Sequence, residues 1–368
     1  MSSGSSDHGN VTTSHSQSIL ARLPKCEHHL HIEGTLSPSL LFELAAKNDV
    51  DLPDRPEFAS QEALEEYYKH FTDLQSFLDA YYVGSSVLIT ADDFERLAWD
   101  YLTAAKRDGV WHAELSFDPQ AHHRRGISID VVIEGLSRAT KRAEAELNMS
   151  TCLIFCLMRD LGLNLALKTL RLAEEHIRNG TIVGIGLDST EVGIDFKSFK
   201  PLYDLALSYG LRITAHAGEE GPPQNVWDTV DVLGCRRVDH GVHAAEDPAL
   251  LQHLADTRTL LTVCPISNVC LKVIEHVRDS PLPQFLAAGV PFSINSDDPA
   301  YFGASGILEC YQAVQNAFNW GPEEWLWICR SSIEGSWMDD EKKDKMLAAC
   351  NVVLAEWESA RGRNNLGR

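Results

Sequence analysis

Short runs of apolar and β-branched residues recur along the chain, and each precedes a stretch of polar residues or of helical periodicity. We expect a strand in each run: Lys25–His31, Gly109–Phe117, Thr151–Met158, Ile182–Asp188, Arg212–Ala217, Arg237–His240, Leu260–Cys264 and Val290–Asp297. Apolar residues at helical spacing predict helices between them, over Val131–Leu147, Leu163–Arg178, Phe199–Tyr209, Pro248–Asp256 and Leu282–Ala288. Strands that alternate with helices predict a parallel sheet with helices outside it.

Eight strands are the number that a closed (β/α)8 TIM-type barrel requires. The region Leu40–Lys106 is mostly helical and too long for one crossover, so we expect a helical insertion after the first strand; the chain after Tyr301 predicts extra C-terminal helices. The alternative is a doubly wound open sheet, but its glycine-rich phosphate turn is not supplied by Gly34 alone. Residues 1–18, rich in Ser, Thr, His and Gly, predict a disordered tail, and residues 19–368 a single domain.

Polar residues that can carry chemistry gather at the carboxyl ends of the predicted strands. They are His29, His31, Asp188, His216, Glu219, His240, Asp297 and Asp298. In a barrel, the loops at these strand ends build the active site. The sequence therefore predicts an active site at the end of the barrel where the carboxyl ends of the strands lie.

The composition of the chain limits the kinds of molecule that it can bind. The net charge of −21 argues against a nucleic-acid partner, which would require a basic surface, but it allows a small neutral substrate; surplus acidic residues also simply keep a protein soluble. Nine scattered cysteines suit a reducing compartment, and we see neither a signal peptide nor a membrane span. We expect a cytoplasmic protein, with the nucleus as an open alternative, and the oligomeric state stays open.

Two histidines in the first strand suggest a metal site. His29 and His31 are two residues apart, so their side chains share one face of a strand, roughly 6–7 Å apart. His216 and the Asp297–Asp298 pair offer further ligands, although a core histidine and a turn or helix cap before Pro299 are the ordinary alternatives. Three imidazoles and one carboxylate suit a single zinc that keeps an open position for water.

Glu219 and His240 have the chemistry of a general acid and a base, and they lie on neighbouring predicted strands. Another zinc deaminase fold also has a histidine and a glutamate two residues apart, as in His112–Ala113–Glu114, but it requires a later Pro-Cys-x-x-Cys. No proline here is followed by cysteine, so we interpret Glu114 as a strand residue near the rim of the site.

Four motifs in order resemble the adenosine/adenine deaminase family of zinc barrels. They are Leu23–Gly34 with its His-Leu-His, His216-Ala-Gly-Glu219, Asp239-His240-Gly241 and Asn295-Ser-Asp297-Asp298-Pro299. The resemblance implies one zinc held by His29, His31, His216 and Asp297. It also implies that Glu219 protonates the purine ring, that His240 orients or deprotonates the metal-bound water, that Asp298 holds the purine, and that Gly186 lets its backbone touch the ring.

Finer detail points to the substrate. Glu33 stands where the adenosine enzymes have Asp, and its extra methylene would intrude where a sugar must sit. Further stretches (His31–Thr35, Gly186–Glu191, Phe117–His122 and Cys264–Asn268) look like the adenine deaminases of fungi and bacteria. The resemblance therefore implies conversion of adenine to hypoxanthine and ammonia in purine salvage, with adenosine or N6-substituted adenines as alternative substrates. His28 departs from the apolar residue of many relatives, and we interpret it as packing.

Two other classes stay open. A two-metal amidohydrolase or phosphotriesterase usually has a modified lysine at the end of the fourth strand, where this chain has Leu187-Asp188. A non-catalytic binding protein on an enzyme scaffold should lack a metal ligand or the acid, and none is missing from the motifs above.

Overall fold

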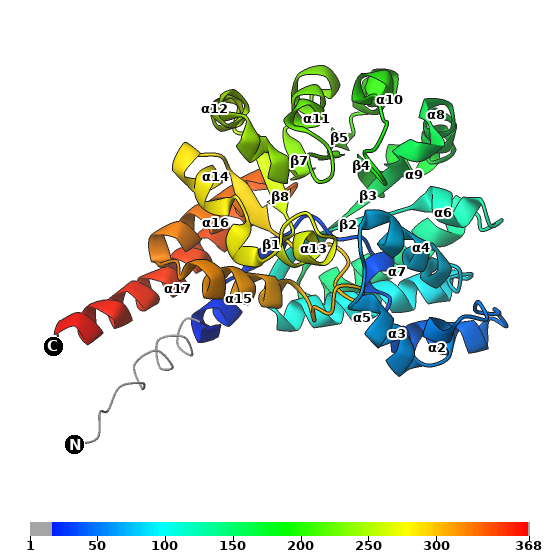
Figure 1. Ribbon diagram of the computed structural model, residues 1–368, viewed down its shortest axis with the longest axis horizontal. Helices are drawn as coiled ribbons and strands as arrows, with labels where there is room; N and C mark the ends of the chain where they lie inside the picture. Colours follow the sequence, from blue (N-terminus) through cyan, green and yellow to red (C-terminus); the bar gives the residue numbers. More distant parts are fainter. Residues whose placement is uncertain (1–16, 367–368) are drawn as a thin grey trace.

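The strands of the computed structural model lie at the centre of the molecule, and the helices surround them (Figure 1). The structure describes residues 17–366. The strands are β1 (Lys25–Glu27), β2 (Val110–Phe117), β3 (Ser150–Met158), β4 (Ile182–Asp188), β5 (Arg212–Ile213), β6 (His216–Ala217), β7 (Arg237–His240), β8 (Leu260–Val263) and β9 (Phe292–Ile294). All neighbouring strands are parallel, in the orders β1-β2-β3-β4-β5 and β6-β7-β8-β9.

The expected strand Arg212–Ala217 is divided into β5 and β6 because it changes partners midway. Before the division it follows β4, and the backbone N–H of Thr214 still donates to the carbonyl of Ile185 (3.0 Å). After it the strand follows β7, and the carbonyl of Ala215 accepts the N–H of Asp239 (2.8 Å). The two groups of strands are therefore joined through one continuous segment.

The first and last strands close the ring. The backbone N–H of His31 donates to the carbonyl of Asp297 (3.1 Å), and the N–H of Asp297 donates to the carbonyl of His29 (3.2 Å). The side-chain oxygen of Asn295 accepts the N–H of His28 (2.9 Å), which ties the two segments together lower down. These bonds join the eighth segment to the first, as the predicted (β/α)8 barrel requires.

Helices cover the outside of the barrel. They are α2 (Pro38–Lys47), α3 (Gln61–Tyr68), α4 (Leu74–Ser85), α5 (Ala91–Arg107), α6 (Pro119–His123), α7 (Ile129–Leu147), α8 (Leu163–Leu172), α9 (Glu174–Arg178), α10 (Lys200–Ser208), α11 (Pro223–Trp227), α12 (Pro248–Asp256), α13 (Pro265–Cys270), α14 (Leu282–Ala288), α15 (Ile307–Phe318), α16 (Pro322–Gly335) and α17 (Asp340–Leu366). The helical insertion is present as α2 to α5, and the C-terminal helices as α15 to α17. The expected helix Leu163–Arg178 is divided into α8 and α9.

The N-terminal boundary differs from the expected one. Residues 1–16 of the predicted tail lie outside the described residues, but residues 17–22 form a helix. This helix is anchored because Ile19 and Leu20 are buried and the ammonium of Lys25 donates to the carbonyls of Leu20 (2.7 Å) and Leu23 (2.9 Å). The ordered chain thus begins before residue 19.

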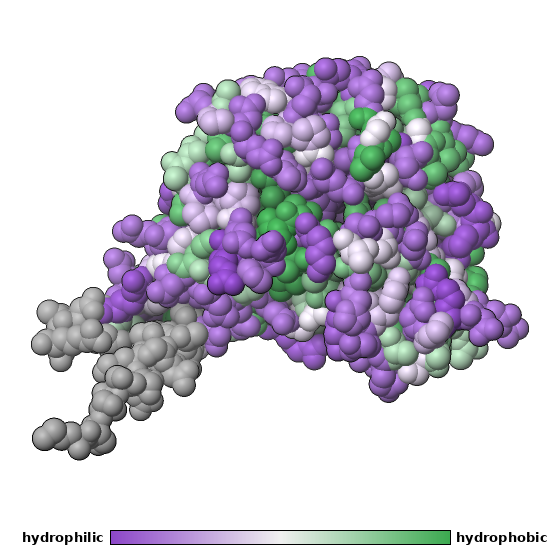
Figure 2. Space-filling model, in the orientation of Figure 1, coloured by the Kyte–Doolittle hydropathy of each residue, from purple (hydrophilic) through white to green (hydrophobic). Residues whose placement is uncertain are grey.

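Surface character varies over the molecule. Hydrophilic residues dominate the face shown in Figure 2, and apolar residues gather near its centre, beside α13. No helix within residues 17–366 combines the length and the apolar character needed to cross a membrane.

Candidate metal centre and active site

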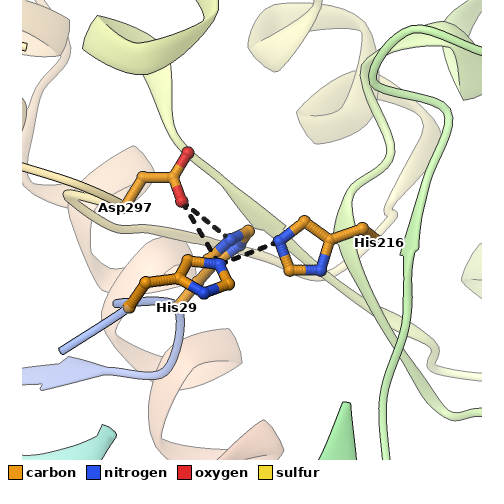
Figure 3. A group of neighbouring side chains, drawn as sticks. His29, His216 and Asp297 are labelled. Atoms are coloured by element: carbon orange, nitrogen blue, oxygen red, sulfur yellow. Dashed lines mark hydrogen bonds and ion pairs between the residues drawn. The ribbon is translucent and has the colours of Figure 1, made fainter. Parts of the chain in front are cut away.

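Four side chains from separate parts of the barrel converge at the carboxyl ends of the strands. His29 and His31 follow β1, His216 begins β6 and Asp297 follows β9. Nε2 of His31 lies 3.1 Å from Nε2 of His216, and Oδ1 of Asp297 lies 3.1 Å from Nε2 of His29 and 3.7 Å from Nε2 of His31. Figure 3 shows His29, His216 and Asp297 turned toward one another. The structure thus brings together the four residues expected to bind zinc.

These donor atoms fit a small divalent cation. Ligands about 2.1 Å from a tetrahedral zinc lie about 3.4 Å apart, and the three distances above fall close to that value. All four residues are buried, and their donor atoms lie within 4.8 Å of one another. Burial, and then the neighbouring His29 and His31, lower the pKa of His216 well below its usual value, so its ring is neutral, as a metal ligand must be.

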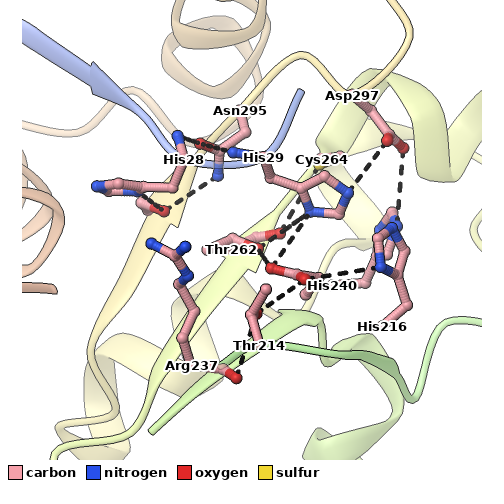
Figure 4. Close-up of polar contacts among 12 residues, drawn as sticks. His28, His29, Thr214, His216, Arg237, His240, Thr262, Cys264, Asn295 and Asp297 are labelled. Atoms are coloured by element: carbon pink, nitrogen blue, oxygen red, sulfur yellow. Dashed lines mark hydrogen bonds and ion pairs between the residues drawn. The ribbon is translucent and has the colours of Figure 1, made fainter. Parts of the chain in front are cut away.

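Asp239 orients two of the imidazoles from behind (Figure 4 shows the surrounding contacts). Its carboxylate accepts the hydroxyls of Thr214 and Thr262, each at 2.8 Å. Thr262 in turn contacts Nδ1 of His29 through Oγ1 (3.0 Å) and its carbonyl (3.2 Å), and Asp239 lies 3.6 Å from Nδ1 of His216. Such partners direct the other ring nitrogen toward the metal. Asp239 stands next to His240 in the motif Asp239-His240-Gly241, but nothing in the sequence alone distinguishes it as a support for the metal ligands.

Glu219 and His240 lie beside the metal donors. Nε2 of His240 is 3.4 Å from Oε2 of Glu219 and 3.7 Å from Oδ2 of Asp297. Burial, and then the charges of Asp297 and Glu191, raise the pKa of Glu219 well above its usual value, so it keeps a proton. Burial, with His29 next, lowers the pKa of His240 to about 3, so its ring is neutral. The pair therefore offers a proton donor and a proton acceptor side by side.

The site has unusual backbone geometry. His240 and Asp297 both adopt a φ of 65°, in the left-handed region that non-glycine residues seldom occupy. Such strain costs about 1–3 kcal/mol per residue and clusters at active sites. Gly34 is required for a different reason, because a Cβ there would lie 1.9 Å from Oδ1 of Asp298. This close approach seats the buried Asp298 against the loop that follows the metal-binding histidines.

A cavity opens beside these groups. It is lined by the metal donors His31, His216 and Asp297, by Glu219 and His240, by the carboxyl residues Asp118, Asp188 and Asp298, by Ser189 and Leu271, and by the α4 face Leu74, Phe77, Leu78, Tyr81 and Tyr82. The helical insertion thus supplies an apolar and aromatic wall. Such a wall excludes water from the polar groups opposite it.

Two residues expected to touch substrate do not line this cavity. Glu33 is fully buried behind it, where its carboxylate accepts the backbone N–H of Asp118 (3.1 Å) and lies 2.8 Å from Nε2 of His122. Gly186 lies within β4, where a Cβ would meet Sγ of Cys156 at 2.7 Å. Ser189, three residues later and with a φ of 71°, lines the cavity instead.

Glu114 also lies elsewhere than expected. It is not at the rim but in the middle of β2, fully buried, where it pairs with Arg237 of β7 (2.6 Å). His28 packs inside the barrel with Nδ1 3.1 Å from Oγ of Ser293. Both residues support the barrel interior below the site.

Comparisons with known proteins agree with this geometry. The family model described as adenosine deaminase matches residues 24–352. An adenine deaminase from Kluyveromyces lactis is 46% identical over 92% of this chain and 96% of its own. A solved structure of adenine deaminase from Arthrobacter aurescens is 40% identical, with a TM-score of 0.85 over 89% of this chain and 98% of that chain. An amidohydrolase from Burkholderia ambifaria, solved with bound zinc, is 24% identical with a TM-score of 0.85 over 94% of each chain and shares the fold. The chain belongs to the adenosine deaminase family.

Proposed function

We propose that this protein is a zinc-dependent adenine deaminase, which hydrolyses adenine to hypoxanthine and ammonia in purine salvage. A buried Glu219 carboxyl, 3.4 Å from Nε2 of His240 and beside a compact set of metal donors, shares one cavity with the buried Asp298, and this arrangement carries the proposal. Hydrolysis of an aromatic amine requires these parts: an activated water, an acid for the ring and a base.

His29, His31, His216 and Asp297 would hold the metal. When bound, zinc lowers the pKa of water and so supplies a nucleophile at neutral pH. Asp239 keeps the imidazoles oriented, through its contacts with Thr214 and Thr262.

The remaining steps use side chains of this cavity. Glu219 donates its proton to the ring nitrogen next to the amine-bearing carbon, which makes that carbon electrophilic. His240 accepts a proton from the attacking water as the new C–O bond forms. His240 returns this proton to the amine, the C–N bond breaks and ammonia leaves, and the proton of the new hydroxyl goes back to Glu219 as the carbonyl forms. Asp298, whose pKa is raised well above its usual value by burial and then by Asp297, holds another ring nitrogen.

Ultraviolet spectroscopy tests this function directly. We expect purified protein to convert adenine to hypoxanthine, to lose activity with a zinc chelator and to regain it when zinc is restored. Metal analysis should give one zinc per chain. A higher kcat/KM for adenosine or N6-methyladenine than for adenine would contradict the choice of substrate, and full activity in the metal-free protein would contradict the mechanism.

A further inference from the structure

Two buried carboxyl groups in the cavity have no part in the chemistry above. Asp118 follows β2, Asp188 ends β4, and both line the cavity. Asp118 is 4% exposed and Asp188 is 3% exposed. Among the described residues, none forms a hydrogen bond with either carboxyl oxygen of Asp188 or with Oδ1 of Asp118. Oδ2 of Asp188 lies 4.0 Å from Nδ1 of His31, which is beyond hydrogen-bond distance. Burial of carboxyl oxygens without a hydrogen bond is costly, so these atoms point to a ligand that supplies N–H donors.

The fold explains why the two groups meet. β2 and β4 are separated by β3, and inward side chains from alternate strands form one layer of a barrel. One side-chain atom each of Asp118, Asp188 and His31 lie within 4.8 Å of one another. The carboxyl pair therefore stands beside a metal ligand, within reach of a molecule whose reacting carbon lies at the metal donors.

Asp118 is also held rigidly. Its Oδ2 accepts the hydroxyl of Tyr81 (3.3 Å), and its backbone N–H donates to Glu33, which His122 supports from the far side. Glu33 thus supports the backbone of Asp118 and does not itself line the cavity. A rigid acceptor discriminates among ligands better than a mobile one, because it cannot relax toward the wrong partner.

We propose that Asp118 and Asp188 bind the imidazole N–H of a free purine base and thereby select the base over its nucleoside. This inference rests on the proposed function, with Glu219 at N1, the ring nitrogen next to the amine-bearing carbon, and Asp298 at N7. The polar edge of adenine that remains is N3 and N9. In the free base N9 carries a hydrogen that an oxygen of this carboxyl pair can accept. In a nucleoside N9 carries the sugar, which leaves the buried acceptor unpaired.

The decisive probe is 9-methyladenine, which lacks the N9 hydrogen but adds only one methyl group. With the zinc-loaded wild-type enzyme we expect kcat/KM for adenine to exceed that for 9-methyladenine by on the order of 10⁴. Equal values for the two compounds would overturn the inference while leaving adenine deamination intact. Failure to deaminate either compound would instead contradict the proposed function.

Variants test whether Asp118 and Asp188 cause the preference for adenine over 9-methyladenine. In Asp188→Ala and in Asp118→Ala we expect the preference for adenine over 9-methyladenine to shrink by about 10-fold to 100-fold, since the acceptor is removed and room is made for the methyl group. Asp231→Ala, a change of an exposed aspartate that contacts His253, should keep the wild-type preference. An unchanged preference in both aspartate variants, folded by thermal melting and loaded with zinc, would overturn the inference. So would two metal ions per wild-type chain, because the pair would then hold a second cation. If neither variant folds, the wild-type comparison still decides.

Discussion

Glu191 holds the loop that carries Glu219: Oε1 of Glu191 accepts the backbone N–H of Glu219 at 2.8 Å. The same carboxylate accepts the backbone N–H groups of Gly218 and Glu220, each at 3.0 Å. In return, Oε2 of Glu220 accepts the backbone N–H of Glu191 and the hydroxyl of Thr190, each at 3.1 Å. The loops after β4 and β6 are thus bound to each other from both sides, and the position of the Glu219 carboxyl depends on that connection.

Replacement of Glu191 should therefore disturb catalysis without removing the metal. In Glu191→Ala we expect kcat to fall by about 10²-fold, because small displacements of a reacting group have effects of this size. Glu191→Gln, which keeps one acceptor oxygen, should recover part of the rate. Steady-state kinetics and metal analysis check this; a change in KM alone, or loss of the metal, would contradict a positioning role.

Glu219→Gln tests the proton donor itself. The amide keeps the shape of the side chain but cannot transfer a proton, so we expect kcat to fall by roughly 10²–10⁴-fold with the zinc still bound. Glu246→Gln is the control, since it changes an exposed glutamate that contacts His243, and it should keep the wild-type turnover. Wild-type turnover in Glu219→Gln would exclude Glu219 as the acid.

Asp239→Ala tests the support behind the metal ligands. Without the carboxylate, the hydroxyls of Thr214 and Thr262 lose their acceptor and His29 and His216 lose their orientation. We expect zinc affinity to fall by about 10-fold to 100-fold, as measured by competition with a chelator. Asp231→Ala, a change of an exposed aspartate that contacts His253, should leave the affinity unaltered. Unchanged affinity in Asp239→Ala would contradict the role.

The buried pair of Glu114 and Arg237 predicts a pH dependence of stability. Burial alone would raise the pKa of Glu114, but Arg237, and then His112, hold it well below the usual value of 4.5. Because the folded pKa is lower than the unfolded one, the stabilisation is present above about pH 4.5 and is lost as the pH falls toward the folded pKa. Glu114→Gln should cost about 3–5 kcal/mol at neutral pH, since it leaves Arg237 buried and unpaired.

Denaturant unfolding at a series of pH values checks this, with a chelator present so that metal binding does not contribute. The difference between wild type and Glu114→Gln should narrow below pH 4.5. The exposed pair of Arg258 and Glu334 is the control: Glu334→Gln should cost at most about 1 kcal/mol at any pH. A constant difference from neutral to acid pH would be inconsistent with an ionised Glu114 in the folded protein.

The alternation of apolar runs and helical periods was sufficient to predict the barrel, its helical insertion and the rim at which polar residues gather. Spacing was sufficient for the local part of the site: His29 and His31 share a strand face, and Asp297 lies at the end of the last predicted strand. These are properties of neighbouring residues and of a repeating pattern, so a linear sequence carries them.

Only the tertiary structure decided how deeply each of these side chains is buried and which residues it contacts. Glu33 and Gly186 lie in motifs next to site residues, but neither of them lines the cavity. Asp118, Glu191 and Asp239 form hydrogen bonds with residues of other segments of the chain, and Asp188 lies beside Asp118. A buried carboxyl group can contact a metal ligand, a backbone N–H group or the open cavity. Which of these it contacts depends on how the strands close into a ring. The periodicity of apolar residues indicates on which face of a helix or strand a side chain lies, but not which residues lie opposite that face.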